Sequence, residues 1–537
     1  MEKENPSSLL LASYLNKSPA ADGPPPTAVP RPSHGKVFVS FSTNYIALRH
    51  YMFTLGILLE IEPLGSKAKR HAMQCEDRIS NLPSNLIGRI LSFLTTKMAV
   101  ATSVLSTRWK QFWTLVTSVD FDDKLMLQRQ KSNRAALQMI FASFVHRVLE
   151  RVSCLDKFRL KCCQSYDVSH VNAWVAAPLK YPIEEFDLSI PVKNSTNHVL
   201  PLDLSSRRTL VVLKLGTKFM LNVPASVCLP SLKILHLDSI QFSDDDSIKR
   251  LLLGCPVLDE LSMNECVGKD VHVINIYAPV LTKLRYRNKR KKSFYSEAEY
   301  KVVIDTPALL YLELIDYEAE VYLVKNLSHI VKADISIAVQ YDETHYKGMT
   351  DLLMGISEVQ SLHLYNSCRE VVHKIYSELP IFHNLTSLVL GAGYVRWVWL
   401  SQLLAKSPCL ERLVFKEGYH IEYDEDACDD EDDSEEDNKS SVWHDWHPPR
   451  IVPSCLLSNL KVIRFLKFRG DGDLRLAKYF LKNAEVLEKL IIHYKLFQKN
   501  FDLAEDQLRV ATQLLMLPRG SRACRIKLVT LRDEESD

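Results

Sequence analysis

From about residue 150 onward, apolar residues recur in a six-residue pattern whose first, fourth and sixth positions are apolar. LDKFRL at 155–160, LKILHL at 232–237 and LTSLVL at 385–390 are clear examples. Successive residues of a β-strand point to opposite faces, so the pattern predicts short strands with one buried face. Thirteen segments fit, with their fourth positions at Phe158, Phe186, Leu213, Leu235, Leu261, Leu284, Leu312, Ala333, Leu362, Leu388, Leu413, Ile463 and Leu490.

These predicted strands recur at a nearly regular interval. Over the first eleven the mean spacing is 25.5 residues, within the roughly 20–29 residues of a leucine-rich repeat. Helix-like runs such as SIKRLLLGCP and WLSQLLAKSP lie between them, and stacking such units creates a continuous core. We therefore predict an α/β leucine-rich-repeat solenoid, a horseshoe with a parallel sheet on its concave side. Thirteen near-regular matches disfavour the alternative, unrelated α/β units whose leucines coincide by chance.

The residue between the paired apolar positions of each strand faces out, toward the concave side. These positions are the predicted substrate contacts: Lys214, His236, Ser262, Arg285, Glu313 and His363, with Asp334, Val389 and Val414 in the same row. Their mixed chemistry indicates no single ligand class. The two histidines are candidates for pH sensing or metal binding, but we favour the interpretation that they are solvated strand residues.

A separate helical unit precedes the repeats. Apolar residues at three- and four-residue spacing predict a first helix within 79–94, and Pro83 suits its first turn. A second short helix is expected around 99–105, and a third after Ser106. A core this small usually needs support, and the cysteine spacing indicates neither a disulfide framework nor a zinc site. The unit therefore requires a partner protein or docking on the repeats.

The run DRISNLPSNLIGRILSFLTTKMAVATSVLSTRWKQFW, residues 77–113, closely resembles the F-box. In that family the helices pack on a Skp-type adaptor, which links to a cullin scaffold. The resemblance implies that the residues forming or supporting the adaptor contact are Leu82, Pro83, Ile87, Ile90, Leu91, Leu94, Val104, Leu105 and Trp109. For Leu105, Phe112 and Trp113 we favour a role in the internal core of the unit.

The run LLSNLKVIRFLKFRGDGDLRLAKYFLKNAEVLEKLIIH, residues 456–493, is similar to the FBD segment that follows leucine-rich repeats in many plant F-box proteins. It predicts a strand, a turn at 470–472, an amphipathic helix through Phe480 and Leu481, and a second strand, which together continue and cap the solenoid. Because members of the family commonly begin close to the F-box, Met73 is an alternative start. The predicted organisation is a disordered or dispensable extension at 1–72, the F-box at 77–123, repeats at 150–420, an acidic disordered insertion at 421–450, and the FBD segment with a C-terminal cap at 453–530.

Two charged runs stand out in a chain of ordinary globular composition, with 46% hydrophobic residues and a net charge of +2. Twelve acidic residues and no basic one lie between Glu422 and Asp437, which leaves +14 on the rest. This run either binds a basic partner or stays unfolded through self-repulsion, and we favour the second. RYRNKRKK at 285–292 carries six basic residues and fits a nuclear import signal or a solvated loop between repeats equally well.

The sequence has no nucleotide-binding, zinc-protease, hydrolase or kinase motif, so we predict a non-catalytic chain without cofactor or metal. No apolar run approaches the roughly 20 residues that span a bilayer, which predicts a location in the nucleus, the cytoplasm or both and no membrane partner. Nucleic-acid binding has little support without interleaved aromatics. The resemblance implies a substrate-recognition subunit of an SCF-type (Skp-cullin-F-box) ubiquitin ligase whose repeats bind an unknown protein. The alternative is a leucine-rich-repeat interaction scaffold unconnected with ubiquitination.

Overall fold

The computed structural model divides the chain into two compact units, residues 1–76 and 77–537. The residues that the structure describes all belong to the second unit. They are 82–104, 109–124, 134–191, 199, 207–216, 218–268, 271–289, 300–337, 343–365, 379–391, 397–416, 451–468, 471–495 and 511–531. The extension predicted at 1–72 and the acidic insertion predicted at 421–450 lie outside the described residues.

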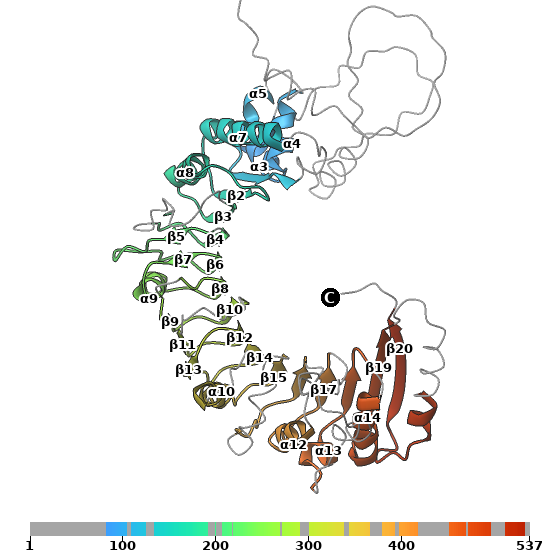
Figure 1. Ribbon diagram of the computed structural model, residues 1–537. Helices are drawn as coiled ribbons and strands as arrows, with labels where there is room; N and C mark the ends of the chain where they lie inside the picture. The colour runs from blue at the N-terminus through green and yellow to red at the C-terminus, as the bar shows by residue number, and fades with distance from the viewer. Residues whose placement is uncertain are drawn as a thin grey trace, which may run out of the picture. The chain divides into compact units, whose positions relative to one another are not determined.

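Fifteen strands of the described residues form one parallel sheet (Figure 1). Each strand pairs with the strand of the next repeat along the chain, as stacked repeats require. In spatial order the strands are β1 (Ser118–Asp122), β2 (Lys157–Lys161), β3 (Glu185–Ser189), β4 (Val212–Gly216), β6 (Ile234–Asp238), β8 (Glu260–Asn264), β10 (Lys283–Asn288), β12 (Tyr311–Asp316), β14 (Lys332–Ile337), β15 (Ser361–Leu364), β16 (Ser387–Leu390), β17 (Arg412–Phe415), β18 (Val462–Phe465), β19 (Lys489–Lys495) and β20 (Arg525–Leu531).

The register confirms all thirteen predicted strands. Each fourth-position residue named above is paired with the corresponding residue of the next strand, from Phe158 through Leu284 to Leu490. All thirteen side chains are buried. Two strands extend the sheet beyond the predicted set, because Val119 of β1 pairs with Phe158 and Ile526 of β20 pairs with Leu490.

The other side of the solenoid carries helices in some repeats and short strands in others (Figure 1). The helix-like runs that the sequence predicts overlap α9 (Asp246–Leu253), α12 (Trp397–Ala405) and α14 (Asp471–Asn483). Further helices are α7 (Arg134–Arg151), α8 (Val168–Ala176), α10 (Glu343–Gly355) and α13 (Ser454–Ser458). A second parallel sheet consists of β9 (Val273–Tyr277), β11 (Lys301–Asp305) and β13 (Val321–Lys325). VINIY, KVVID and VYLVK are rich in β-branched residues, which favour strands. Two-residue strands, β5 (Met220–Leu221) and β7 (Gln241–Phe242), also pair on this side.

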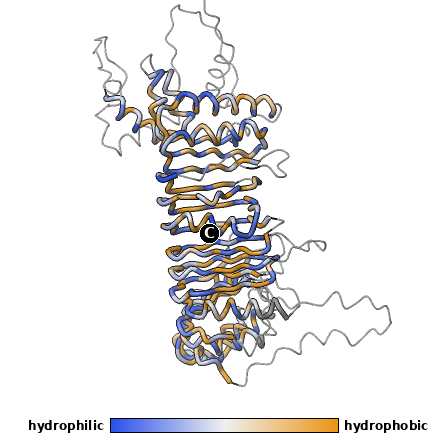
Figure 2. The backbone as a smooth tube through the Cα atoms, turned by 90° about the vertical axis from the view of Figure 1, so that its left-hand side faces the viewer, coloured by the Kyte–Doolittle hydropathy of each residue, from blue (hydrophilic) through white to orange (hydrophobic). Residues whose placement is uncertain are grey.

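One hydrophobic core cluster extends from Ile87 to Cys524. It lies between the two sides of the solenoid, and Figure 2 shows hydrophobic and hydrophilic residues alternating along the stacked repeats. The predicted order of strand, helix and strand in the C-terminal segment is found as β18, α14 and β19, so this segment continues the same sheet. None of the helices described has both the length and the apolar character needed to cross a membrane.

Candidate functional site

The front unit consists of short helices that lead directly into the first strand of the sheet. They are α3 (Ser84–Leu91), α4 (Thr96–Ala101), the 3₁₀ turn η1 (Thr102–Val104), α5 (Trp109–Phe112) and the 3₁₀ turn η2 (Trp113–Leu115). Pro83 occupies the N-cap of α3, so the helix begins at Ser84, one residue after the proline that the sequence placed in its first turn. Thr95 caps α4, because its Oγ1 accepts a hydrogen bond of 3.4 Å from Met98 N–H.

The inner side of the front unit is docked on the repeats. Ile87, Leu91, Trp113 and Val116 are buried in the same core cluster as Val119 of β1. Two side chains after α3 also hold the first strand: Ser92 Oγ accepts from Thr117 N–H at 3.0 Å and Thr96 Oγ1 accepts from Asp120 N–H at 2.6 Å. Of the two means of support that the sequence left open, docking on the repeats is therefore confirmed.

The outer side of the front unit exposes apolar surface. Leu86 retains 45% of its exposure and Phe93 retains 56%, beside the exposed Pro83 and the half-buried Ile90. Leu86, Ile90 and Phe93 follow one another at spacings of four and three residues, and so lie along one side of α3 and the turn after it. Exposed apolar residues gathered in this way mark an interaction surface more often than isolated ones do.

The predicted adaptor residues fall into three groups. Leu82, Pro83, Ile90 and Leu94 are exposed or half-buried. Ile87, Leu91 and Trp109 are at most 8% exposed, so they support the outer surface from beneath. Leu105 and the side chain of Val104 lie outside the description, whereas the core role favoured for Phe112 and Trp113 is confirmed by their burial. The prediction omitted Leu86 and Phe93, although the apolar stripe of α3 is wider than one buried face needs.

Gly88 allows α3 to pack closely against η2. A Cβ at this position would lie 2.8 Å from the backbone oxygen of Leu115. We expect Gly88→Ala to lower the free energy of unfolding of the front unit by about 1–3 kcal/mol, because the backbone must move to accept the methyl group. Urea unfolding followed by the fluorescence of the nearby tryptophans measures this change.

Gly348→Ala is the matched control for Gly88→Ala. Gly348 also lies in a helix, α10, but its Cβ would meet no atom closer than 3.5 Å. This substitution should be neutral or stabilise by up to about 1 kcal/mol, because alanine favours helix over glycine. Equal effects of the two substitutions would contradict the close packing of α3 on η2.

The predicted substrate residues lie in one row across the outward face of the sheet, although four members of the row are at most 8% exposed: Glu313, Asp334, Val389 and Val414. Lys214 pairs with His236, His236 with Ser262, and Ser262 with Arg285. The row continues through Glu313 and Asp334 to His363, and then through Val389 to Val414. The structure therefore brings together all nine residues, which the sequence spreads over 201 positions from Lys214 to Val414.

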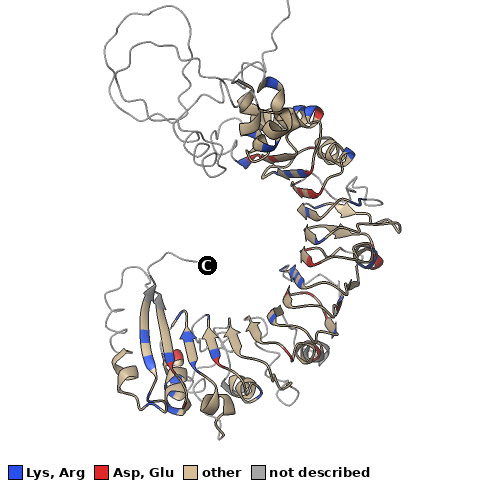
Figure 3. Cartoon of the chain, turned by 180° about the vertical axis from the view of Figure 1, so that it is seen from behind, with Lys and Arg blue, Asp and Glu red and all other residues tan. Residues whose placement is uncertain are grey.

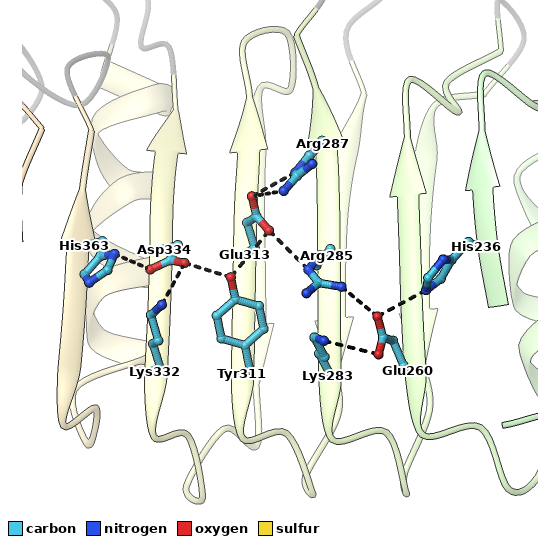
Figure 4. Close-up of polar contacts among 10 residues, drawn as sticks. All are labelled: His236, Glu260, Lys283, Arg285, Arg287, Tyr311, Glu313, Lys332, Asp334 and His363. Carbon is cyan, nitrogen blue, oxygen red and sulfur yellow. Dashed lines mark hydrogen bonds and ion pairs between the residues drawn. The ribbon is translucent and has the colours of Figure 1, made fainter. Parts of the chain in front are cut away.

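Three carboxylates hold this row together through ion pairs with neighbouring strands (Figure 4). Glu260 lies 2.6 Å from Arg285, 3.1 Å from His236 and 3.2 Å from Lys283. Glu313 lies 2.7 Å from Arg287 and 3.5 Å from Arg285. These contacts join β6, β8, β10 and β12 into one charged network.

Asp334 forms the third centre of the network, on β14. Its carboxylate lies 2.7 Å from His363 Nδ1 and 3.4 Å from Lys332 Nζ, and it accepts a hydrogen bond of 2.7 Å from the Tyr311 hydroxyl. The Lys332 ammonium also lies 5.3 Å from the centre of the Tyr311 ring, within the range of a cation–π contact. Both histidines of the row thus contact a carboxylate, so the expectation of simply solvated histidines needs correction.

The network lowers the pKa of two of its carboxylates, Asp334 and Glu260. Burial acts to raise the pKa of Asp334, but hydrogen bonds from His363 and Tyr311 outweigh it and lower the pKa. The pKa of Glu260 is lowered in the same way, by Lys283 and His236 against burial. Because these pKa values are lowered in the folded protein, the stability that they contribute is present at neutral pH and is lost as the pH falls through them.

Comparisons with known proteins agree with both parts of the structure. The family model of the F-box domain matches residues 79–119, and the model described as At1g61320/AtMIF1, LRR domain, matches residues 150–501. F-box/LRR-repeat protein At2g42730 of Arabidopsis thaliana is 31% identical over 483 residues, which cover 86% of this chain and 99% of the relative. This chain belongs to the F-box/LRR-repeat protein family. F-box/LRR-repeat protein At3g59210 of the same plant is 32% identical over 85% of this chain and 95% of its own.

Membership places the front unit and the sheet in known classes. The front unit is the F-box region, and the solenoid is the LRR domain with its parallel sheet. A relative 31% identical over 85% of this chain, At3g59240 of Arabidopsis thaliana, has FBD in its name. An F-box joined to leucine-rich repeats supports a ubiquitin-ligase adaptor-type role in general, with the F-box implying a Skp-type adaptor as a partner.

Proposed function

We propose that this chain is the substrate-recognition subunit of an SCF-type ubiquitin ligase. The F-box would bind a Skp-type adaptor, and through it a cullin scaffold, while the leucine-rich repeats hold the target protein. The observation that supports this most is the apolar outer side of the F-box, where Leu86 stays 45% exposed although Ile87 beside it is fully buried.

The chain itself needs no catalytic group in this role. Ubiquitin transfer would take place elsewhere on the assembled ligase, and the receptor would contribute by holding the target in place. Holding two reactants in a productive geometry is equivalent to effective concentrations of about 10⁵ M or more. A rigid connection between the F-box and the repeats favours this, and α3 and β1 belong to one continuous core.

A binding measurement with purified adaptor tests the proposal. We expect the full chain to capture the adaptor, and the double variant Leu82→Ala/Pro83→Ala to weaken capture at least about tenfold, because both residues lie on the proposed contact. Surface plasmon resonance gives the dissociation constants. Circular dichroism checks that the repeats remain folded.

Pro256→Ala/Val257→Ala is the matched control, since it removes another exposed proline and apolar residue, before β8. It should leave capture unchanged. Failure of the wild-type chain to bind any Skp-type adaptor would reject the ligase proposal.

The rival function is an interaction scaffold in which the F-box region only caps the solenoid. Trp113 and Val116 are buried in the core that they share with β1, which is the arrangement that a capping role requires and is the observation that favours this second candidate. Capping leaves the exposure of Leu86 unexplained, whereas an adaptor contact accounts for it.

The ligase proposal also includes a location in the nucleus or cytoplasm, a protein target, and neither membrane nor nucleic acid as a partner.

A further inference from the structure

The last four strands of the sheet present a face unlike the rest. The outward residues of β17–β20, taken from the register, are Arg412, Val414, Val462, Arg464, Lys489, Ile491, His493, Arg525, Lys527 and Val529. All of these side chains are exposed or half-buried except that of Val414, which is buried. Five of them are exposed cations and none is a carboxylate. We call this surface the C-terminal face, and Figure 3 shows lysines and arginines along these strands.

Within the part of the chain that the structure describes, no carboxylate forms an ion pair with a cation of the C-terminal face. These cations are Arg412, Arg464, Lys489, Arg525 and Lys527. The nearest acidic residues lie just before the strands, where Glu411 pairs with Lys461 at 2.9 Å and Glu488 lies near the same lysine. Burial, and then the charges of Arg464 and Lys527, lower the pKa of His493, so these two cations lie close enough to act on its imidazole.

In the middle of the sheet, by contrast, the cations already contact carboxylates of neighbouring strands. Glu260, Glu313 and Asp334 each contact cations of neighbouring strands, as described above. A partner that covered this network would remove water from ion pairs that are already formed. The attraction within such pairs offsets little of that desolvation penalty. Unpaired cations gain a new ion pair when an anion approaches. The C-terminal face is therefore the part of the sheet better suited to a charged partner.

Apolar side chains alternate with the cations across these strands. Val462 lies between Arg412 and Lys489 in one row. Arg464 lies between Val414 and Ile491 in the next row, which ends at Lys527. These apolar residues are aliphatic, whereas sequence-tolerant binding of single-stranded nucleic acid relies on aromatic residues that stack with bases. The alternation instead matches a polypeptide whose acidic and aliphatic side chains are interspersed.

We propose that the C-terminal face binds an extended acidic segment of the target protein, with carboxylates on its arginines and lysines and aliphatic side chains on Val462 and Ile491. The proposal rests on the receptor function proposed above and adds the class of target. Neighbouring strands lie about 4.8 Å apart and an extended chain advances about 3.3 Å per residue, so about five residues cross the four strands.

An eight-residue peptide in which glutamate alternates with valine, labelled with fluorescein, is the probe. Fluorescence anisotropy with the full chain should detect binding that weakens as salt is added, because charged contacts on a surface are screened. Arg464→Glu/Lys527→Glu should weaken binding at least about tenfold. Equal binding of a peptide with lysine in place of glutamate, or unchanged binding by the double variant, would overturn the proposal.

Lys180→Glu/Lys249→Glu is the matched control, because both lysines are exposed and lie away from the sheet, Lys180 in the 3₁₀ turn at 178–180 and Lys249 in α9. It makes the same change in net charge and should leave peptide affinity within about twofold of the wild type. The two double variants should also capture the adaptor as the wild type does. Loss of peptide binding is thereby separated from loss of the proposed ligase function.

Two other occupants are distinguished by the same assay. A single-stranded DNA octamer that binds more tightly than the peptide and displaces it would reassign the face to nucleic acid. The chain's own acidic run, Glu422–Asp437, follows β17 in the sequence. If the peptide binds only after residues 422–437 are deleted, the face belongs to this run and the proposal of an acidic partner is wrong.

Discussion

Leu86→Asp should abolish capture of a Skp-type adaptor while the repeats stay folded. Leu86 lies on the outer side of α3, 45% exposed, between Pro83 and Ile90. The few residues that dominate an interface each contribute about 2 kcal/mol or more, which corresponds to about a thirtyfold change in dissociation constant. A carboxylate at the same place adds the cost of burying a charge, so we expect a loss larger than thirtyfold, measured by isothermal titration calorimetry.

Leu253→Asp provides a comparison of the same chemistry at another site. Leu253 is 58% exposed at the end of α9, on the side of the solenoid away from the sheet. It should leave adaptor affinity unchanged, and both variants should keep the unfolding transition of the wild type because the replaced side chains are exposed. Normal capture by Leu86→Asp would remove the outer side of α3 from the adaptor contact.

The strands of the sheet could be predicted from the sequence because their signal is local. Two apolar residues separated by one outward residue define a strand, and the constant offset between repeats then defines the register, as Leu284 and Leu312 illustrate. The strand β1 was missed although VTSVDF, residues 116–121, fits the six-residue pattern, because it lies before residue 150, where the predicted repeats begin. The strand β20 gives a weaker signal, because the leading apolar position of its pattern is only an alanine, Ala523. The strands β9, β11 and β13 occupy positions where a repeat more often carries a helix, and only their β-branched residues indicate the difference.

The surfaces were predicted less completely than the core. The row from Lys214 to Val414 could be predicted from alternation alone. The contacts of the adjacent row could not be predicted, because they depend on side-chain geometry across strands; this row contains Glu260, Lys283, Tyr311 and Lys332. The basic character of the C-terminal face was missed because its cations are spread over residues 412–527 and come together only when the strands β17–β20 pair. Exposure of Leu86 could not be predicted either, since a wide apolar stripe fits a helix covered on both sides equally well.

A buried carboxylate in β12 predicts a second large effect, a change in the free energy of unfolding with pH. Asp316, at the end of β12, is fully buried. It accepts hydrogen bonds of 2.8 Å from the Tyr300 hydroxyl and of 3.0 Å from the Glu318 backbone N–H. Burial nevertheless dominates and raises the pKa of Asp316 to about 7. At neutral pH the folded chain therefore holds a carboxyl group whose ionisation opposes folding.

Asp316→Asn should stabilise the protein increasingly as the pH rises from about 4 to about 7. A carboxyl group whose pKa is raised on folding binds more protons in the folded state across this window, so its contribution to the free energy of unfolding falls as the pH rises. The advantage of the variant should grow by up to about 1.4 kcal/mol per pH unit and level off above pH 7. Urea unfolding of both proteins at each pH measures it.

Tyr300→Phe tests the same group from the opposite direction. The Tyr300 hydroxyl donates to both oxygens of Asp316, and this bond acts to lower the pKa of the carboxyl group. Its removal should raise that pKa further, so the fall in stability with pH should continue above pH 7 in Tyr300→Phe and be absent in Tyr300→Phe/Asp316→Asn. A difference between Asp316→Asn and the wild type that stays constant from pH 4 to pH 7 would show that Asp316 is ionised throughout, and that its hydrogen bonds outweigh its burial.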